Sequence, residues 1–308
     1  MKTKVIDKDY LLNRTLNFKS IQVQNMKEKI SPIIKPEELL NLRGAEDLIV
    51  FDVSNNPNAK ANYDAKHLKG GFFVDINTQL ADIKPNTADG GRHPLPTVEK
   101  FCETISNLGI SPSTHVVIYD DKNGANAAAR FWWMLKAVGH EKVQVLDGGL
   151  EAAVKAGFPT SDNNEKLPKK GDYKCEKWLL PIADLAEIDE VYQNPDYLII
   201  DVRETPRYKG ETEPFDKVAG HIPNTKNIPF AENLDAEGYF LSSVILQGKY
   251  SEELENFDTE NIIVHCGSGV TACHTLLAFD YAGLEIPKLY VGSWSEWSSN
   301  DRPIVSEK

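Results

Sequence analysis

The chain has 308 residues, enough for two domains, and its 46 acidic and 34 basic residues give a net charge of −12 at pH 7. With 41% apolar and 26% charged residues it has the composition of an ordinary folded protein, and its charge argues against nucleic acid or an anionic membrane as a bulk partner. Four cysteines are too few for a disulfide scaffold, and no apolar run reaches the roughly 20 residues of a membrane span, so we expect a cytoplasmic protein.

Residues 1–30 begin with basic side chains but lack the continuous apolar block of a secretory signal. Asp7 and Asp9 also argue against a mitochondrial transit peptide, because such peptides are poor in acidic residues. We interpret this segment as an N-terminal extension.

Residues 31–160 alternate short β-branched runs with helical patterns. The runs DLIVFDV (47–53) and THVVIYD (114–120) are typical of buried strands, and FWWMLKAV (131–138) is typical of a helix that ends at Gly139. This alternation predicts an α/β domain, with a mostly parallel sheet covered by helices on both faces.

Residues 161–175 are polar, charged and interrupted by proline and glycine, so we expect them to link two domains. The segment 176–308 then repeats the earlier alternation. YLIIDV (197–202) and NIIVHC (261–266) are typical of strands, and TLLAFDYA, which runs up to Gly283, is typical of a helix.

The two segments can be aligned at an offset of about 150 residues. The landmark pairs are Asp52 with Asp201, His67 with His221, and Asp120 with Cys266. The alignment predicts one fold present twice, in which the first copy lacks a cysteine at the loop position of the second. Because the paired histidines occur in both copies, we expect them to be structural.

Cys266 lies between a predicted strand and a predicted helix, in the loop HCGSGVTAC. Such a loop directs backbone N–H groups and the positive end of the helix dipole at the residue that follows the strand. Gly267 and Gly269 allow the backbone to wrap closely around a sulfur atom or an anion. This setting favours the reactive thiolate, which predicts a nucleophilic cysteine rather than one more buried thiol. Cys273, about two helical turns later, is expected to pack in the core.

Several segments resemble the two-domain rhodanese sulfurtransferases, from about residue 33 to 306. They are CGSGVTAC (266–273), DVRETPRYKG (201–210), AGHIPNTKNIPF (219–230), LDGGLEA (146–152) and GSWSEW (292–297). The resemblance implies two tandem rhodanese-like domains, a non-catalytic one at 31–160 and a catalytic one at 176–308. It also implies that Cys266 carries sulfur as a persulfide.

The neutral loop form CGSGVTAC resembles that of the 3-mercaptopyruvate sulfurtransferases. The resemblance implies that Ser268 and His93 assist proton transfer, with His93 supplied by the first domain. The family's aspartate partner aligns with Asn77, so Asp75 and Asp89 are the candidates to replace it.

The resemblance also assigns donor binding. Arg207 is the candidate to hold the donor's carboxylate, because its planar fork matches that group; the alternative is a structural ion pair. Arg203 is expected to be structural. The loop residues Gly267, Gly269, Val270 and Thr271 are expected to line the site. The second basic residue that the family places nearby is absent as an arginine, and only Lys217 stands in that segment.

The predicted reaction moves sulfur from 3-mercaptopyruvate through Cys266 to cyanide, a thiol or a thioredoxin-like acceptor, and releases pyruvate. Thiosulfate as donor and a protein-to-protein sulfur relay remain alternatives. A cysteine phosphatase loop, HCxxGxxR, would need an arginine where Ala272 stands, which disfavours that class. We expect no metal and no cofactor, because the cysteines and histidines show no paired ligand spacing.

Overall fold

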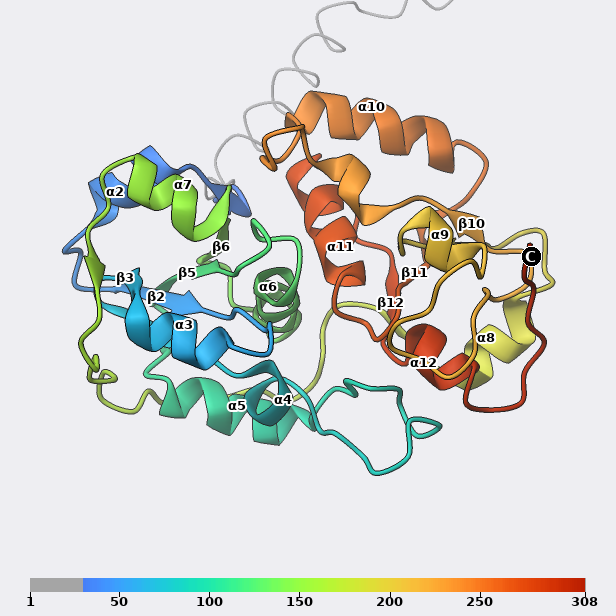
Figure 1. The fold of residues 1–308 in the computed structure, drawn as a ribbon, viewed down its shortest axis with the longest axis horizontal. Helices are drawn as coiled ribbons and strands as arrows, with labels where there is room; N and C mark the ends of the chain where they lie inside the picture. The colour runs from blue at the N-terminus through green and yellow to red at the C-terminus, as the bar shows by residue number, and fades with distance from the viewer. Residues whose placement is uncertain (1–29, 308) are drawn as a thin grey trace, which may run out of the picture. The chain divides into compact units, whose positions relative to one another are not determined.

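The computed structural model describes residues 30–307. The predicted N-terminal extension therefore lies almost entirely outside the described residues. The part from Ser31 onward forms one compact unit built from two parallel sheets (Figure 1).

The first sheet has five parallel strands in the order β1-β6-β5-β2-β4. Their bounds are β1 (Ile33–Ile34), β2 (Leu48–Asp52), β4 (Gly71–Phe73), β5 (His115–Tyr119) and β6 (Val143–Leu146). A separate antiparallel pair joins β3 (His67–Leu68) to β7 (Thr160–Ser161). The helices of this copy are α2 (Pro36–Leu42), α3 (Ala59–Ala65), α4 (Ile76–Gln79), α5 (Val98–Asn107), α6 (Ala127–Ala137) and α7 (Gly149–Lys155).

The second sheet repeats this topology, with the parallel order β10-β9-β11-β12-β8. Its strands are β8 (Ile182–Ala183), β9 (Leu198–Asp201), β10 (Lys226–Asn227), β11 (Ile262–His265) and β12 (Lys288–Tyr290). Its helices are α8 (Leu185–Val191), α9 (Thr205–Tyr208), η1 (Phe230–Asn233), α10 (Ser243–Leu254), η2 (Thr259–Asn261), α11 (Ala272–Tyr281) and α12 (Ser293–Trp297). Read from its opposite edge, this order matches the first sheet strand for strand, which confirms the predicted repeat.

Successive residues of the central strands enter different cores, which shows that helices cover both faces of each sheet. In β2, Phe51 packs in the core that holds α5 and α6, whereas Val50 packs with residues of α2 and α7. In β9, Ile200 packs in the same core as Phe51, whereas Ile199 packs with residues of α8 and α12. The predicted α/β class is therefore confirmed.

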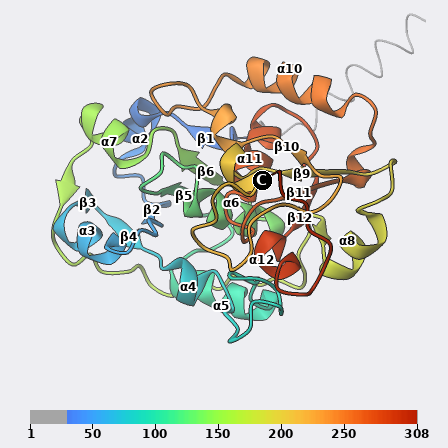
Figure 2. The ribbon, with the colours of Figure 1, turned by 45° about the vertical axis from the view of Figure 1, so that its right-hand side comes forward.

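Helices α6 and α11 pack directly against each other and join the inner cores of the two copies. They lie side by side between the sheets in both views (Figure 1 and Figure 2). Gly139 and Gly283 follow the ends of these helices with φ of +83° and +74°, the left-handed conformation that glycine adopts without strain. Both predicted helix ends are confirmed.

The segment predicted as a linker packs against the first copy. The N–H of Gly171 donates to the Ser106 carbonyl over 2.8 Å, and the N–H of Tyr173 donates to the Ser106 hydroxyl over 3.1 Å. Just beyond the segment, Trp178 contacts the rings of Phe101 and Trp133. The connection is thus fixed along α5 and α6. In residues 30–307 no helix is long and apolar enough to cross a membrane.

Candidate active site

Cys266 is the first residue after β11, at the carboxyl edge of the second sheet. The strand sequence IIVH is fully buried, as expected for a central parallel strand. The loop then enters α11, whose first hydrogen-bonded turn includes the carbonyls of Val270 and Thr271. Gly269 has φ of +71°, and a Cβ there would lie 2.5 Å from the Val291 carbonyl oxygen. Glycine is therefore required for the loop to pass this close to the strand end.

The start of α12 fixes the backbone around the cysteine. The N–H of Cys266 donates to the Ser293 hydroxyl over 3.2 Å, and its carbonyl accepts the Trp294 N–H over 3.1 Å. The Gly267 carbonyl accepts the Ser295 N–H over 2.9 Å. Only 2% of Cys266 is exposed, so the residue is buried. Trp294 and Trp297 are fully buried, which supports core packing for the segment GSWSEW (292–297).

Ser268 and His93 come from different copies and lie in contact with each other. The His93 Nδ1 lies 2.8 Å from the Ser268 hydroxyl oxygen, two residues beyond Cys266. Burial, together with the charges of Arg130 and Arg92, lowers the pKa of His93 to about 4. The imidazole is therefore neutral near pH 7 and can exchange a proton with the serine hydroxyl.

The expected carboxylate partner of His93 is not there. The Asp75 carboxylate accepts the N–H groups of Asn77 and Thr78 at 2.7 and 3.3 Å and so caps α4. Within residues 30–307 neither Asp75 nor Asp89 hydrogen bonds to His93. The proposal that either carboxylate replaces the family aspartate is therefore unsupported. The charged groups that act on His93 are two arginines.

Arg130 is a site residue that the sequence analysis missed. It is fully buried in α6 of the first copy, yet its Nη1 donates to the Gly269 carbonyl over 3.0 Å and its Nη2 to the His93 carbonyl over 3.2 Å. Burial lowers the pKa of Arg130, while the nearby Cys273 and Cys266 thiols oppose that shift. Among the described residues no carboxylate pairs with it. A lone arginine in the apolar run AAARFWWML was the available signal.

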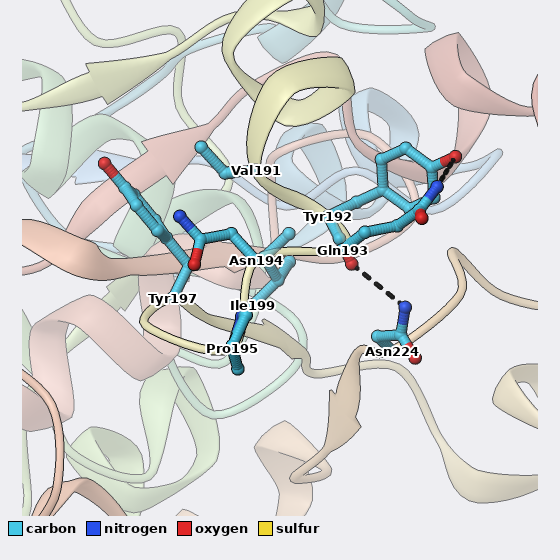
Figure 3. A pocket seen from close by; sticks show the side chains of 8 residues that line it. All are labelled: Val191, Tyr192, Gln193, Asn194, Pro195, Tyr197, Ile199 and Asn224. Carbon is cyan, nitrogen blue, oxygen red and sulfur yellow. Dashed lines mark hydrogen bonds between the residues drawn. The ribbon is translucent and has the colours of Figure 1, made fainter.

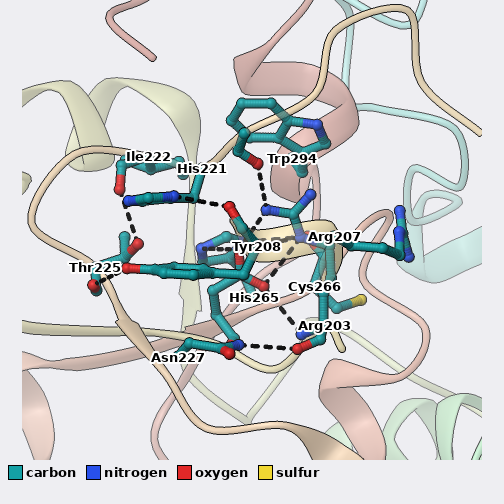
Figure 4. Close-up of polar contacts among 12 residues, drawn as sticks. Arg203, Arg207, Tyr208, His221, Ile222, Thr225, Asn227, His265, Cys266 and Trp294 are labelled. Atoms are coloured by element: carbon teal, nitrogen blue, oxygen red, sulfur yellow. Dashed lines mark hydrogen bonds and ion pairs between the residues drawn. The ribbon is translucent and has the colours of Figure 1, made fainter. Parts of the chain in front are cut away.

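Arg203 and Arg207 have different surroundings (Figure 4). Arg203 is buried against Asp201, with Nη2 to Oδ2 at 2.6 Å, and also donates to the Gly220 carbonyl. Burial raises the pKa of Asp201, but the Arg203 and His265 charges outweigh it and hold that pKa below its usual value. Arg203 is therefore structural, as predicted. The Arg207 side chain extends away from Asp201 and donates to Glu213 over 2.9 Å. Glu213 also accepts from the Arg203 Nη1 over 3.3 Å, so this carboxylate connects the two arginines.

The paired histidines have one structural role in both copies. His67 stacks on Tyr63 with ring centroids 4.1 Å apart, and its Nδ1 lies 2.7 Å from the Tyr63 carbonyl oxygen. His221 stacks on Tyr208 at 3.8 Å, and its Nδ1 lies 2.8 Å from the Tyr208 carbonyl oxygen. This repeated packing confirms that they hold the fold.

The equivalent loop of the first copy is filled by its own carboxylate. Asp120 follows β5 just as Cys266 follows β11, and both its oxygens accept backbone N–H groups of the loop. The donors are Lys122 at 2.8 Å, Gly124 at 2.9 Å, Asn126 at 3.0 Å and Ala128 at 3.0 Å. An aspartate thus occupies the anion-binding cradle internally.

Other cavities and clusters lie away from this chemistry. A cavity of about 250 Å³ is lined by residues between α8 and β9 together with Asn224 (Figure 3). It borders the amino end of β9, whereas Cys266 lies at the carboxyl edge of the sheet. Its lining includes Tyr192 and Tyr197 but no acidic, basic or cysteine side chain. In residues 30–307 no group of three or more histidine, cysteine or acidic side chains could hold a metal ion.

Comparison with known proteins identifies the same two units. The rhodanese-like domain family matches residues 35–156 and 184–300. The chain is 36% identical over 280 residues to a probable 3-mercaptopyruvate sulfurtransferase of Pseudomonas aeruginosa, covering 89% of this chain and 97% of that protein. It is 35% identical over 285 residues to a putative thiosulfate sulfurtransferase, SseB, of Mycobacterium tuberculosis, covering 88% and 96%. The solved 3-mercaptopyruvate sulfurtransferase of Leishmania major superposes with a TM-score of 0.77 at 27% identity, covering 90% of this chain and 76% of that one.

Proposed function

The chain belongs to the rhodanese family and is a sulfurtransferase, and from this premise we propose that it takes sulfur from 3-mercaptopyruvate as a persulfide on Cys266. The observation that carries the choice of donor is the 2.8 Å contact between His93 and Ser268 beside the thiol. A donor whose leaving group is an enolate needs a proton delivered to carbon, and a hydroxyl–imidazole pair can deliver one.

The first half-reaction forms one S–S bond and breaks one C–S bond. The Cys266 thiolate attacks the donor sulfur, and the C–S electron pair passes to carbon as the enolate of pyruvate. Ser268 and neutral His93 carry the donor's thiol proton to that carbon, which gives pyruvate and a Cys266 persulfide anion. Backbone amides of the loop stabilise this anion, and they belong to Gly267, Gly269, Val270 and Thr271.

In the second half-reaction a thiophilic acceptor attacks the outer sulfur and restores the thiolate. With cyanide the products are thiocyanate and the free enzyme, so charge and atoms balance. A small thiol or a thioredoxin-like protein is the corresponding cellular acceptor. Arg207 holds the donor's carboxylate during the first half-reaction, because a planar guanidinium matches that group.

The two copies divide these tasks in our proposal. The segment 176–308 carries the nucleophile, whereas 31–160 is non-catalytic by itself and supplies His93. The filled cradle around Asp120 supports this division, because the first loop has no thiol and four of its backbone amides already donate to the Asp120 carboxylate. All four cysteines are free, which supports a reducing, cytoplasmic compartment.

The test is thiocyanate formation from cyanide with either 3-mercaptopyruvate or thiosulfate as donor. We expect the wild type to prefer 3-mercaptopyruvate and Cys266→Ser to be inactive with both donors. Cys175→Ser is the matched control, because it removes a partly buried thiol that has no place in the site. Full activity of Cys266→Ser would refute the nucleophile, and a preference for thiosulfate would refute the donor. If neither donor supports turnover, that result would favour a protein-to-protein sulfur relay.

A further inference from the structure

Helix α12 contacts both of the loops that carry reacting groups. At the Cys266 loop, the Ser295 N–H donates to the Gly267 carbonyl over 2.9 Å. At the loop of the first copy that leads to His93, the Ser295 hydroxyl accepts the Arg92 N–H over 3.0 Å. Gly267 directly follows the nucleophile and Arg92 directly precedes the imidazole. A single residue therefore joins the chain neighbours of both groups.

Glu296, the next residue of α12, makes a second contact with the loop of the first copy. Its Oε1 accepts the Gly90 N–H over 2.8 Å, two residues before Arg92. Its Oε2 lies over Gly292 at the start of the helix, where a Cβ would collide with it. Because a carboxylate accepts a backbone N–H more strongly than a neutral group does, this contact fixes the loop firmly.

The loop and the helix are also closely packed. The Asn300 side-chain amide donates to the Ala88 carbonyl over 2.9 Å. Gly91 has φ of +78°, and a Cβ there would lie 2.6 Å from the Ser295 hydroxyl oxygen, so the loop backbone itself lies against α12. Residues 88–92 therefore follow α12 and the turn after it.

The Ser295 hydroxyl has a defined orientation. It is fully buried, and it donates to the Gly292 carbonyl over 3.0 Å while it accepts the Arg92 N–H. A buried polar group with all its partners in place holds its neighbours in one geometry. His93 is the next residue of the loop, and its Nδ1 lies 2.8 Å from the Ser268 hydroxyl oxygen. A shift of the loop by about 1 Å would break that contact.

We propose that Ser295 and Glu296 are positioning residues, which hold the loop of the first copy so that His93 meets Ser268 beside the thiol. The inference rests on the proposed function, since it assumes that His93 takes part in the release of pyruvate. Both residues act through backbone N–H groups of the loop. They determine where the imidazole lies, and misplacement of a reacting group by about 1 Å can lower a rate on the order of 100-fold.

The experiment measures the rate constant for the first pyruvate released per active site, at saturating 3-mercaptopyruvate and without an acceptor. This rate constant reports the first half-reaction, in which His93 acts. Ser295→Ala removes the hydroxyl but keeps the backbone bond to Gly267, and it should lower the rate constant about tenfold. In the His93→Asn background the same substitution should change the rate constant less than about twofold, because the positioned group is gone.

Two control measurements distinguish positioning from general damage. Ser298→Ala is the matched control, because the Ser298 hydroxyl donates to the Trp294 carbonyl of the same helix over 2.7 Å, and it should behave as wild type. Iodoacetamide should alkylate Cys266 at the wild-type rate in Ser295→Ala, because the backbone contacts of that loop remain.

Glu296 provides an independent pair of variants. Glu296→Ala removes the acceptor of the Gly90 N–H and should lower the rate constant for pyruvate release about tenfold. Glu296→Gln should restore most of that loss, because an amide oxygen can still accept this N–H.

The outcomes separate the inference from the proposed function. If the wild type releases no pyruvate from 3-mercaptopyruvate, or if His93→Asn releases it at the wild-type rate, the proposed function fails and the inference fails with it. If His93→Asn is slow but Ser295→Ala keeps the wild-type rate constant, only the inference is overturned. An equal loss from Ser295→Ala with and without His93, or slower alkylation of Cys266, would also overturn it, since either result indicates a structural role. Should Ser295→Ala fail to fold, Glu296→Ala in the two backgrounds decides, and equal rate constants or equal losses overturn the inference.

Discussion

The protonation state of His93 gives the sharpest kinetic expectation. Burial and two neighbouring arginines lower the pKa of His93 to about 4, so the imidazole stays neutral well into the acid range. At pH 5.5 a group with a pKa of about 4 is only about 3% protonated, whereas an ordinary histidine with a pKa of about 6.5 is about 90% protonated. A catalytic role for neutral His93 should therefore persist at pH 5.5.

The assay is the ratio of kcat/KM for wild type to that of His93→Asn, measured from pH 8 to pH 5.5 with 3-mercaptopyruvate. The ratio cancels the titration of the donor and of Cys266, because both occur in each enzyme. General acid–base assistance of this kind contributes about 10²-fold or more, so the ratio should be of that order and flat across the range. A ratio that falls about tenfold between pH 7.5 and pH 5.5 would show an ordinary histidine pKa and refute the reasoning. A ratio near one at every pH would remove His93 from the mechanism.

Three further expectations concern the buried groups around the site. Asp120→Ala leaves the four N–H donors of the first loop without an acceptor. The free energy of unfolding in urea should therefore fall by an amount on the order of 3 kcal/mol, with kcat retained. An unchanged unfolding midpoint would contradict a stabilising role for Asp120 in this loop. Arg130→Met removes the hydrogen bonds to the Gly269 and His93 carbonyls, so kcat/KM should fall about tenfold or more. Iodoacetamide should also alkylate Cys266 more slowly at neutral pH. Wild-type values for both measurements would exclude a role for the Arg130 cation. Burial lowers the pKa of His274 to about 3 in the folded chain. Above pH 6.5 the His274 imidazole is neutral in both the folded and the unfolded chain. As the pH falls below 6.5, only the unfolded chain binds a proton at His274, which lowers the free energy of unfolding. Between pH 7 and 5.5 the wild type should therefore lose about 1 kcal/mol more stability than His274→Gln, and equal losses would contradict the burial effect.

The fold was predictable because each buried parallel strand and each helix has a recognisable pattern of apolar residues in the sequence. Asp52, Asp201 and Cys266 were all expected at strand ends, and each lies at or just after the end of its strand. The glycines after α6 and α11 were recognised because only glycine readily takes the left-handed conformation at a helix end. The position of the nucleophile followed from the same local rules.

The residues that the first copy contributes were harder to predict. Their roles depend on how α6 packs against α11, and no local pattern encodes that contact. Arg130 stands in an apolar run that is typical of a core helix, whereas its guanidinium contacts the loop of the other copy. Asp75 was one of two candidate partners for His93, with Asp89, but its carboxylate caps α4. A side chain that caps a helix cannot be distinguished in sequence from one that faces a histidine.

The most direct test of the central claim is the intact mass of the protein after incubation with 3-mercaptopyruvate in the absence of an acceptor. We expect the wild type to gain the mass of one sulfur atom, located by peptide mapping at Cys266, and to lose it when cyanide is added. Cys266→Ser should gain nothing. A sulfur adduct on Cys266→Ser, or no adduct on wild type that is turning over, would contradict a persulfide at this residue.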